Sequence, residues 1–234
     1  MYKIAIFSDI HGNKEALDAI LKDANKEMVN EIINLGDTIG IGPDPKGCLD
    51  ILMGSYVRNI FGNHELYYLN GTIKEQGMSN EEKVHHWWIA NNLSTVHEAF
   101  IRNTFDLSYT KEVKGMRFLF MHFPIDISIN DYYKPKDYLS KNIEDLTTEY
   151  TFDYYFYGHK HEKDYKLHKG KHYIGIPAAG LGKKKTTTYA ILKYDESSIN
   201  VEFKDIPYNR GKFMKSFKAT DIPDKKFIKK TFYK

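Results

Sequence analysis

Five short polar motifs run in order along this chain of 234 residues, and each directly follows a run of strand-forming residues. Their side chains comprise two carboxylates, one amide and five imidazoles, all of them groups that bind divalent metal ions. No cysteine is among them. The motifs are Asp9-Ile10-His11, Gly36-Asp37, Gly62-Asn63-His64, His122 and Gly158-His159-Lys160-His161.

The number of candidate ligands favours two metal ions over one. A set of eight exceeds what one four-to-six-coordinate ion can use, but it suits two ions that share a bridging carboxylate. A single histidine is more often structural than metal-binding, so no motif decides the matter alone. The five together disfavour a purely structural explanation. Two ions about 3.5–4 Å apart would lower the pKa of a water to about 7 and polarise phosphoryl oxygens.

The apolar runs before the motifs indicate what positions them. They cover residues 4–7, 32–35, 57–61, 118–121 and 154–157. Ligands gather at the carboxyl ends of strands in sheets of this kind, because the loops there converge on one edge. We therefore expect the motif side chains to point into a common cleft, held by rigid sheets to the tolerance that metal coordination demands.

The remaining pattern predicts alternating strands and helices. Strands at 2–7, 31–35 and 56–61, with helices at 13–25 and 45–53, imply a parallel sheet with right-handed crossovers. Helices at 81–92 and 94–103 interrupt this rhythm. A hairpin follows at 106–113 and 116–121, then a helix at 136–148 and a strand at 154–157. Residues 164–168, 171–176, 187–194 and 199–206 look like antiparallel strands, and the last 25 or so residues look partly helical.

These elements predict an α/β fold, a four-layer α/β/β/α sandwich of two mixed β-sheets flanked by helices. Each half of the chain would supply one mixed strand set, and the two sets would pack face to face. We expect a single domain over residues 1–234, with a small helical cap insertion at about 66–105 beside the metal site. A split into two domains near residue 66 is disfavoured, because ligands from both halves must meet.

Composition places few further limits on function. Hydrophobic residues make up 41% and charged residues 28%, an ordinary globular balance. Cys48 has no partner for an internal disulfide, which fits a reducing compartment. The N-terminal apolar run is too short for a signal peptide and no stretch suits a membrane span, so we expect a cytoplasmic location and no membrane partner. Only four of 34 basic residues are arginine, and the basic tail at 225–230 suits a solvated helix face, which disfavours nucleic acid as a partner.

The motifs resemble those of the calcineurin-like metallophosphoesterase superfamily. That family carries Asp-x-His, Gly-Asp, Gly-Asn-His followed by Glu or Asp, a lone His, and Gly-His-x-His, in this order. The longer stretches Ser8–Asn13 and Gly36–Pro45 are similar to its compact bacterial and archaeal phosphodiesterase branch. The resemblance covers roughly the first two-thirds of the chain.

The resemblance implies a role for each residue of the motifs. The first metal would be held by Asp9, His11 and His161. The second would be held by Asn63, His122 and His159, and Asp37 would bridge both. His64 would stay off the metals, and it is the best candidate for the catalytic group that protonates the leaving alkoxide. The cofactors would be two divalent ions, with manganese as the first choice and iron, zinc, nickel or cobalt as alternatives.

We therefore expect a binuclear metal-dependent phosphohydrolase in which a metal-bridging hydroxide attacks phosphorus. A phosphodiesterase acting on a small phosphoester or nucleotide is favoured. The alternatives are a phosphomonoesterase and a non-catalytic protein-binding scaffold of the same fold. Two departures stand out: Thr38-Ile39-Gly40 replaces the Asp-Arg-Gly of protein phosphatases, and Ile176–Gly182 replaces a segment of the type Asn-Pro-Gly-Ser-x-Gly. Oligomeric state stays open.

Several other side chains admit two interpretations. Trp87 and Trp88 could stack on a nucleobase, but inward packing is favoured. The histidines at 85, 86 and 97 could reach a phosphate, but a solvent-facing or hydrogen-bonded structural role is favoured. For Glu65, orienting His64 and simply beginning the next turn are weighted evenly.

Overall fold

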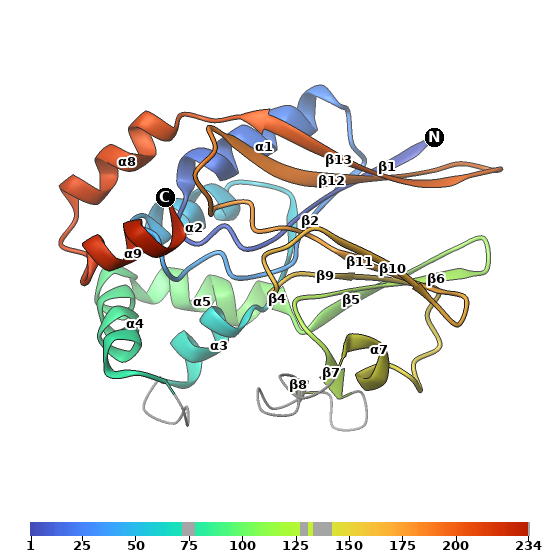
Figure 1. Ribbon diagram of the computed structural model, residues 1–234, viewed down its shortest axis with the longest axis horizontal. Coiled ribbons are helices and arrows are strands. Elements are labelled where there is room, and N and C mark those ends of the chain that lie inside the picture. The colour runs from blue at the N-terminus through green and yellow to red at the C-terminus, as the bar shows by residue number, and fades with distance from the viewer. Residues whose placement is uncertain (72–77, 127–130, 133–141, 234) are drawn as a thin grey trace.

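The computed structural model describes residues 1–71, 78–126, 131–132 and 142–233. Two mixed sheets lie one above the other (Figure 1). The first has the strand order β13-β12-β1-β2-β3-β4, in which β1 to β4 run parallel and β12 is antiparallel to β1. Its strands are β1 (Tyr2–Phe7), β2 (Glu31–Asn34), β3 (Val57–Ile60), β4 (Phe105–Asp106), β12 (Thr186–Tyr194) and β13 (Ile199–Pro207).

The second sheet has the order β10-β11-β9-β6-β5, with parallel pairs on both sides of β9 and antiparallel pairs at its two edges. Its strands are β5 (Ser108–Val113), β6 (Met116–Met121), β9 (Tyr154–Tyr157), β10 (Asp164–His168) and β11 (Lys171–Gly175). A separate short pair joins β7 (Ile125–Asp126) to β8 (Asp131–Tyr132). The prediction of two mixed sheets is therefore confirmed.

The prediction that each half of the chain builds one sheet is wrong for the last hairpin. β12 and β13 return to the first sheet, where β12 covers the edge of β1 that β2 leaves open. The burial of β12 explains this choice. Tyr189, Ala190, Ile191 and Leu192 are all buried, so the strand needs neighbours on both of its faces, as an internal position in the first sheet provides.

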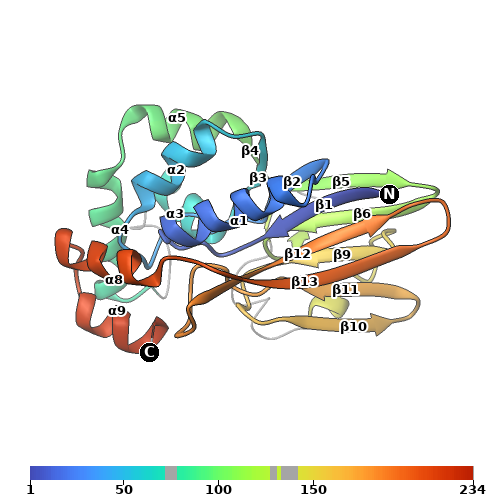
Figure 2. The ribbon, with the colours of Figure 1, turned by 90° about the horizontal axis from the view of Figure 1, so that it is seen from above.

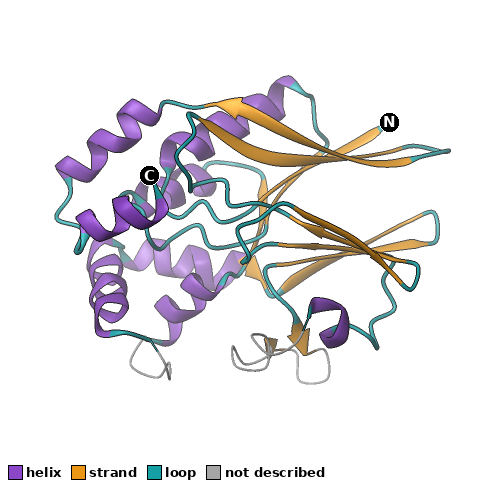
Figure 3. Cartoon of the chain, viewed as in Figure 1, coloured by secondary structure: helices purple, strands orange, loops and turns teal. Residues whose placement is uncertain are grey.

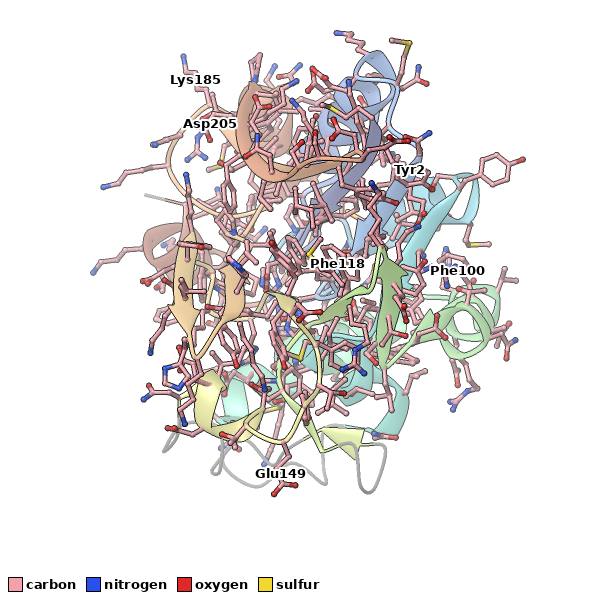
Figure 4. The ribbon with its side chains drawn as sticks, turned by 90° about the vertical axis from the view of Figure 1, so that its right-hand side faces the viewer. Tyr2, Phe100, Phe118, Glu149, Lys185 and Asp205 are labelled. Atoms are coloured by element: carbon pink, nitrogen blue, oxygen red, sulfur yellow. The ribbon has the colours of Figure 1, made fainter. Side chains whose placement is uncertain are left out.

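The layers follow from the alternation of side chains along the strands. In β1, Ile4 and Ile6 point toward the second sheet and pack in one core with Phe118 and Phe156, while Ala5 and Phe7 point toward the helices. Figure 4 shows Phe118 in the interior between the two sheets. The far side of the second sheet packs on α7 (Ile143–Leu146). Helix, sheet, sheet and helix thus form the predicted four layers.

Most helices cover the first sheet or gather at one end of it. The covering helices are α1 (Lys14–Lys26), α2 (Pro45–Met53) and α8 (Arg210–Ala219). The α3 (Asn63–Asn70) helix begins with the third motif, and the α4 (Asn80–Asn92) and α5 (Thr95–Thr104) helices make up the predicted insertion. The α8 and α9 (Lys225–Phe232) helices lie near α4 (Figure 2). Figure 3 shows most helices on one side, with the strands of both sheets extending away from them. Helices at 81–92 and 94–103 are confirmed within one residue of each end.

The predicted helix at 136–148 falls partly on residues 133–141, which lie outside the described residues; its described part contains only α7. The partly helical C-terminal region is confirmed by α8 and α9. In the described part of the chain, no helix combines the length and the apolar character needed to cross a membrane.

Candidate metal centre

The first group of candidate ligands joins the loop after β1 to the loop after β9. The Nε2 atoms of His11 and His161 lie 3.2 Å apart. Oδ1 of Asp9 lies 3.3 Å from Nε2 of His161 and 3.6 Å from Nε2 of His11. One ligand atom from each of these residues falls within 4.8 Å of the other two, so a single ion could contact all three.

The second group joins the loops after β3, β6 and β9. Oδ1 of Asn63 lies 2.9 Å from Nδ1 of His159 and 3.3 Å from Nε2 of His122. Nδ1 of His122 lies 3.0 Å from the carbonyl oxygen of Leu35, which can accept its proton. That hydrogen bond would leave the lone pair of Nε2 facing the group, as metal-binding histidines require.

Asp37 connects the two groups. Its Oδ2 atom lies 3.2 Å from Nε2 of His122 and 4.0 Å from Nε2 of His11. Its Oδ1 atom accepts a hydrogen bond from the backbone N–H of His64 at 2.9 Å, at the start of α3. The carboxylate therefore lies between the two sets of imidazoles.

The loops that carry these side chains are fastened to each other through the backbone. The N–H groups of Asp9, His11 and Gly12 donate to the carbonyls of Gly36, Asp37 and Thr38, each at 2.9 Å. The loop after β11 joins them, because the N–H of Gly180 donates to the carbonyl of Asp9 at 2.9 Å. Segments far apart in sequence thus hold the ligands as one rigid unit.

Five of the candidate ligands have left-handed backbone conformations, with φ between 46° and 66°: Asp9, His11, Asp37, His159 and His161. Residues other than glycine adopt such angles infrequently, and each one costs of order 1–3 kcal/mol. Such strain gathers at functional sites, where the surrounding structure enforces it. Gly36 also has a positive φ, and a side chain there would overlap the backbone of Gly62, so only glycine lets these two loops approach.

Glu65 fastens the loop of Asp37 to the start of α3. Its side chain is fully buried and accepts hydrogen bonds from the N–H groups of Asp37, Thr38, Ile39 and Gly62, at 2.8 to 3.1 Å. Of the two interpretations from the sequence, a place at the start of the next turn is confirmed, because Glu65 stands in the first turn of α3 and accepts the N–H of Gly62. Glu65 fixes the backbone of Asp37 rather than the ring of His64.

The electrostatics of the candidate ligands favour a charged carboxylate on Asp9, neutral rings on His11 and His159, and a protonated ring on His122. Burial by itself would raise the pKa of Asp9, but His122 and His161 outweigh it and bring that pKa down to about 2. Burial lowers the pKa of His11 and of His159 to about 4. Burial also opposes a charge on His122, yet Asp37 and Asp9 raise its pKa to about 9. Metal binding would therefore have to displace a proton from His122.

The residues present fit a divalent metal. Oδ1 of Asp9 and Nδ1 of His11 are buried and have no hydrogen-bond partner among the described residues. A buried carboxylate oxygen without a partner is costly, and a metal ion is one of the few groups that would satisfy it. The donors are imidazole, carboxylate and amide, which suit manganese, iron, cobalt, nickel and zinc.

Comparison with known proteins agrees with this geometry. The Calcineurin-like phosphoesterase superfamily domain matches residues 2–197 of the sequence. The chain belongs to this superfamily. A metallophosphoesterase structure from Sphaerobacter thermophilus aligns with a TM-score of 0.65 at 19% identity, covering 95% of both chains.

Two archaeal proteins are also similar over nearly their whole length. A hypothetical protein from Pyrococcus horikoshii OT3 has a TM-score of 0.78 at 15% identity, covering 100% of this chain and 98% of the other. An uncharacterized protein of Methanocaldococcus jannaschii is 26% identical over 244 residues, which is 94% of each chain. Membership makes this chain a metal-dependent phosphoesterase of α/β fold.

The structure brings all the predicted site residues of the phosphoesterase together. The seven predicted metal ligands lie in the two groups and their shared carboxylate, and their individual roles stay predictions. His64 lies beside them, with Nε2 3.9 Å from Oδ2 of Asp37. It also forms a possible metal-binding group with His11 and Asp37, so proximity does not by itself separate His64 from the ligands.

Sequence reasoning gave too little weight to His86. The prediction of a solvent-facing or hydrogen-bonded structural histidine holds for His97, which is buried and bonds Asp50 through Nε2 at 2.9 Å. His86 is also buried, but its Nε2 lies 3.2 Å from Nδ1 of His64. The only sequence feature that could have pointed to His86 is the pair His85-His86, and the pair does not indicate which of the two rings faces the candidate metal centre.

The two neighbouring tryptophans behave differently. Trp88 is 7% exposed and its Nε1 donates to Asp221 at 2.7 Å, so inward packing is confirmed for it. Trp87 is 69% exposed, so inward packing is wrong for it. Successive helix positions point about 100° apart, and α4 has only one face against the body of the protein.

Proposed function

We propose that this phosphoesterase is a binuclear metal-dependent phosphodiesterase acting on a small phosphoester or nucleotide. The position of the Asp37 carboxylate supports this proposal, because Oδ2 faces His122 at 3.2 Å and His11 at 4.0 Å, one from each ligand group. Asp9, His11 and His161 would hold one ion. Asn63, His122 and His159 would hold the other.

The metals, when bound, would supply Lewis-acid chemistry by polarising the phosphoryl oxygens and lowering the pKa of a water to about 7. The protein contributes charge balance. Two divalent ions bring four positive charges, and Asp9 and Asp37 offset two of them, which leaves the site attractive to an anionic ester. Manganese is the first choice for activity in vitro, with iron, zinc, nickel and cobalt as alternatives that the same donors accept.

His64 is the proposed group for protonating the leaving oxygen. Its side chain is 17% exposed, whereas those of His11 and His122 are fully buried, so it can meet a bound ester from the solvent side. Its position at the start of α3, next to Asn63, holds it beside the ligands. A general acid placed in this way contributes roughly 10²–10⁴ to the rate.

The contacts of the arginines favour a phosphodiester over a phosphomonoester as the substrate. A monoester carries up to two negative charges and gains most from a guanidinium clamp. All four arginines of the chain are engaged elsewhere: Arg58 with Asp106, Arg102 with Glu98, Arg117 over the ring of Phe152, and Arg210 with the carbonyls of Gly182 and Tyr233. A singly charged diester needs less neutralisation.

The test is hydrolysis of bis-p-nitrophenyl phosphate beside p-nitrophenyl phosphate, with manganese added to metal-free protein. We expect faster turnover of the diester and loss of activity with a chelator. The Asp37→Asn variant should lose about a thousandfold in rate, which corresponds to several kcal/mol of transition-state stabilisation by the metals. Turnover of the monoester alone would replace the proposal with a phosphatase. No turnover of either ester with any of the five metals would favour a scaffold.

A further inference from the structure

The ring of His64 is held from one side by α4. Its Nδ1 lies 3.2 Å from Nε2 of His86, and the two rings stack with centroids 4.9 Å apart and planes 21° from parallel. On α4, His86 is 4% exposed and lies 22 residues further along the chain. Two imidazole nitrogens at this distance can form one hydrogen bond, and the tautomers of the two rings decide which nitrogen donates.

Gly40 bounds the His64 ring as well. A side chain at Gly40 would come within 2.5 Å of Nδ1 of His64, so the backbone of the Asp37 loop passes directly against the ring. Tyr67 contacts both imidazoles edge-on, with centroids 6.0 Å from His64 and 5.5 Å from His86. The ring of His64 is therefore enclosed by backbone, an aromatic edge and a second imidazole.

His86 is suited to accept a hydrogen bond from His64. Burial lowers the pKa of His86 to about 4, against an opposing effect of Asp37 and Glu82, so its ring is neutral near pH 7. A neutral imidazole offers one acceptor nitrogen. In the part of the chain that the structure describes, no carboxylate bonds Nδ1 of His64, so His86 takes the place that an acidic residue takes in a catalytic triad.

We infer that His86 is a positioning residue of the phosphodiesterase: it accepts the Nδ1–H of His64 and thereby turns the Nε2–H of His64 toward the leaving oxygen of the substrate. The Nε2 proton then moves to that oxygen, while Nδ1 keeps its own proton and its bond to His86. This inference rests on the proposed function. It assigns to the helical insertion a part in the reaction, since the residue that orients His64 comes from α4 and not from any strand-end loop. His86 itself belongs to none of the possible metal-binding groups among the described residues.

The kinetic test compares two leaving groups. The ribose alkoxide of 2′,3′-cyclic AMP needs a proton, whereas the p-nitrophenolate of bis-p-nitrophenyl phosphate departs without one. We expect His86→Leu to lower kcat on the cyclic nucleotide roughly tenfold to a hundredfold, part of the contribution of a general acid, with KM unchanged and little loss on the activated diester. His86→Gln, which restores an acceptor near the position of Nε2, should recover most of the lost rate.

Two controls separate positioning from packing. His85→Leu changes a neighbouring buried histidine on the same helix, and the described structure gives His85 no hydrogen bond to His64. It should leave the ratio of the two rates unchanged. In a His64→Ala background, His86→Leu should cause no further loss. Equal losses on both substrates, or a further loss in the His64→Ala background, would overturn the inference.

A spectroscopic measurement keeps this inference separate from the proposed function. In zinc-loaded protein labelled with ¹⁵N, the His64 ring should carry a proton on Nδ1, and His86→Leu should shift the Nδ1 resonance while His85→Leu should not. A wild-type His64 ring without a proton on Nδ1, or no response to His86→Leu, would contradict the positioning role. Failure of every ester to react would instead refute the proposed function, whatever the spectrum.

Discussion

The strand-end loops and the helical insertion contribute to the same centre in different ways. The loops hold Asp9, His11 and Asp37 through backbone hydrogen bonds and strained φ angles, and their side chains are fully or almost fully buried. The insertion reaches the centre through one side chain of α4, His86, stacked on His64. The difference suggests that the loops fix where metals can bind, whereas the insertion sets how one side chain faces the substrate.

The largest expected effect separates the two regions directly. His64→Ala should retain both metals, because the ligand groups lie on the loops, yet lower kcat on an ester with an alkoxide leaving group by roughly 10²–10⁴. Metal content by elemental analysis and turnover of 2′,3′-cyclic AMP check this. Loss of an ion from the variant would make His64 a ligand, as its proximity to His11 and Asp37 allows.

The next effect tests the junction between the regions. Glu65→Ala would leave four buried N–H groups without their acceptor, so we expect a loss of roughly 3 kcal/mol in the free energy of unfolding and weaker metal binding. Urea unfolding and metal titration measure both. Glu98→Ala, which removes an exposed carboxylate paired with Arg102, is the matched control and should change neither quantity noticeably. Unchanged metal affinity in Glu65→Ala would mean that the Asp37 loop holds its shape alone.

Acid should weaken the insertion by a smaller amount. Burial lowers the pKa of His85 and of His86 to about 4, below the value near 6.5 in an unfolded chain. Between these values the unfolded chain binds protons that the native state does not. Stability is therefore complete above about pH 6.5 and falls as the pH drops toward 4, by up to about 1.4 kcal/mol per pH unit for each group.

Urea unfolding of metal-free protein at pH 7, 6 and 5 would measure this slope. His85→Leu should make the slope shallower by up to the share of one group. A slope that does not change in the variant would show that His85 binds protons equally in the native and the unfolded state. The native structure would then shield His85 from water less than its burial suggests.

The smallest effect concerns Trp87. Its side chain is 69% exposed, so Trp87→Ala should change the free energy of unfolding by less than about 0.5 kcal/mol. It should also leave KM unchanged, both for 2′,3′-cyclic AMP and for bis-p-nitrophenyl phosphate. A higher KM for the nucleotide only would assign Trp87 to stacking on the base, and the insertion would then contact substrate directly.

The candidate ligands of the metal centre could be predicted from the sequence, because each one is a polar residue placed just after an apolar strand. The four layers followed from the same alternation. The geometry that holds the ligands could not be predicted, since it depends on hydrogen bonds between separate loops. The N–H of His11, where φ is positive, donates to the carbonyl of Asp37 in the next loop, and the N–H of His159, where φ is also positive, donates to the side chain of Asp9, 150 residues away. The return of β12 and β13 to the first sheet depends likewise on which edge of β1 is left uncovered.

The insertion was the least predictable part. Its helices were correctly placed, yet a helix pattern does not reveal which of two adjacent histidines, or of two adjacent tryptophans, faces the body of the protein. That depends on how α4 packs, and only the folded chain shows it. For Glu65, a carboxylate three residues after Gly62 is a recognisable capping arrangement, but its bonds to residues 37–39 involve a separate loop.

A crystal structure of the protein loaded with manganese, with the ions located by anomalous scattering, tests the central claim most directly. We expect two ions about 3.5–4 Å apart, bridged by Asp37, with Asp9, His11 and His161 on one and Asn63, His122 and His159 on the other. A single ion, or a second ion that Asp37 does not contact, would contradict the account.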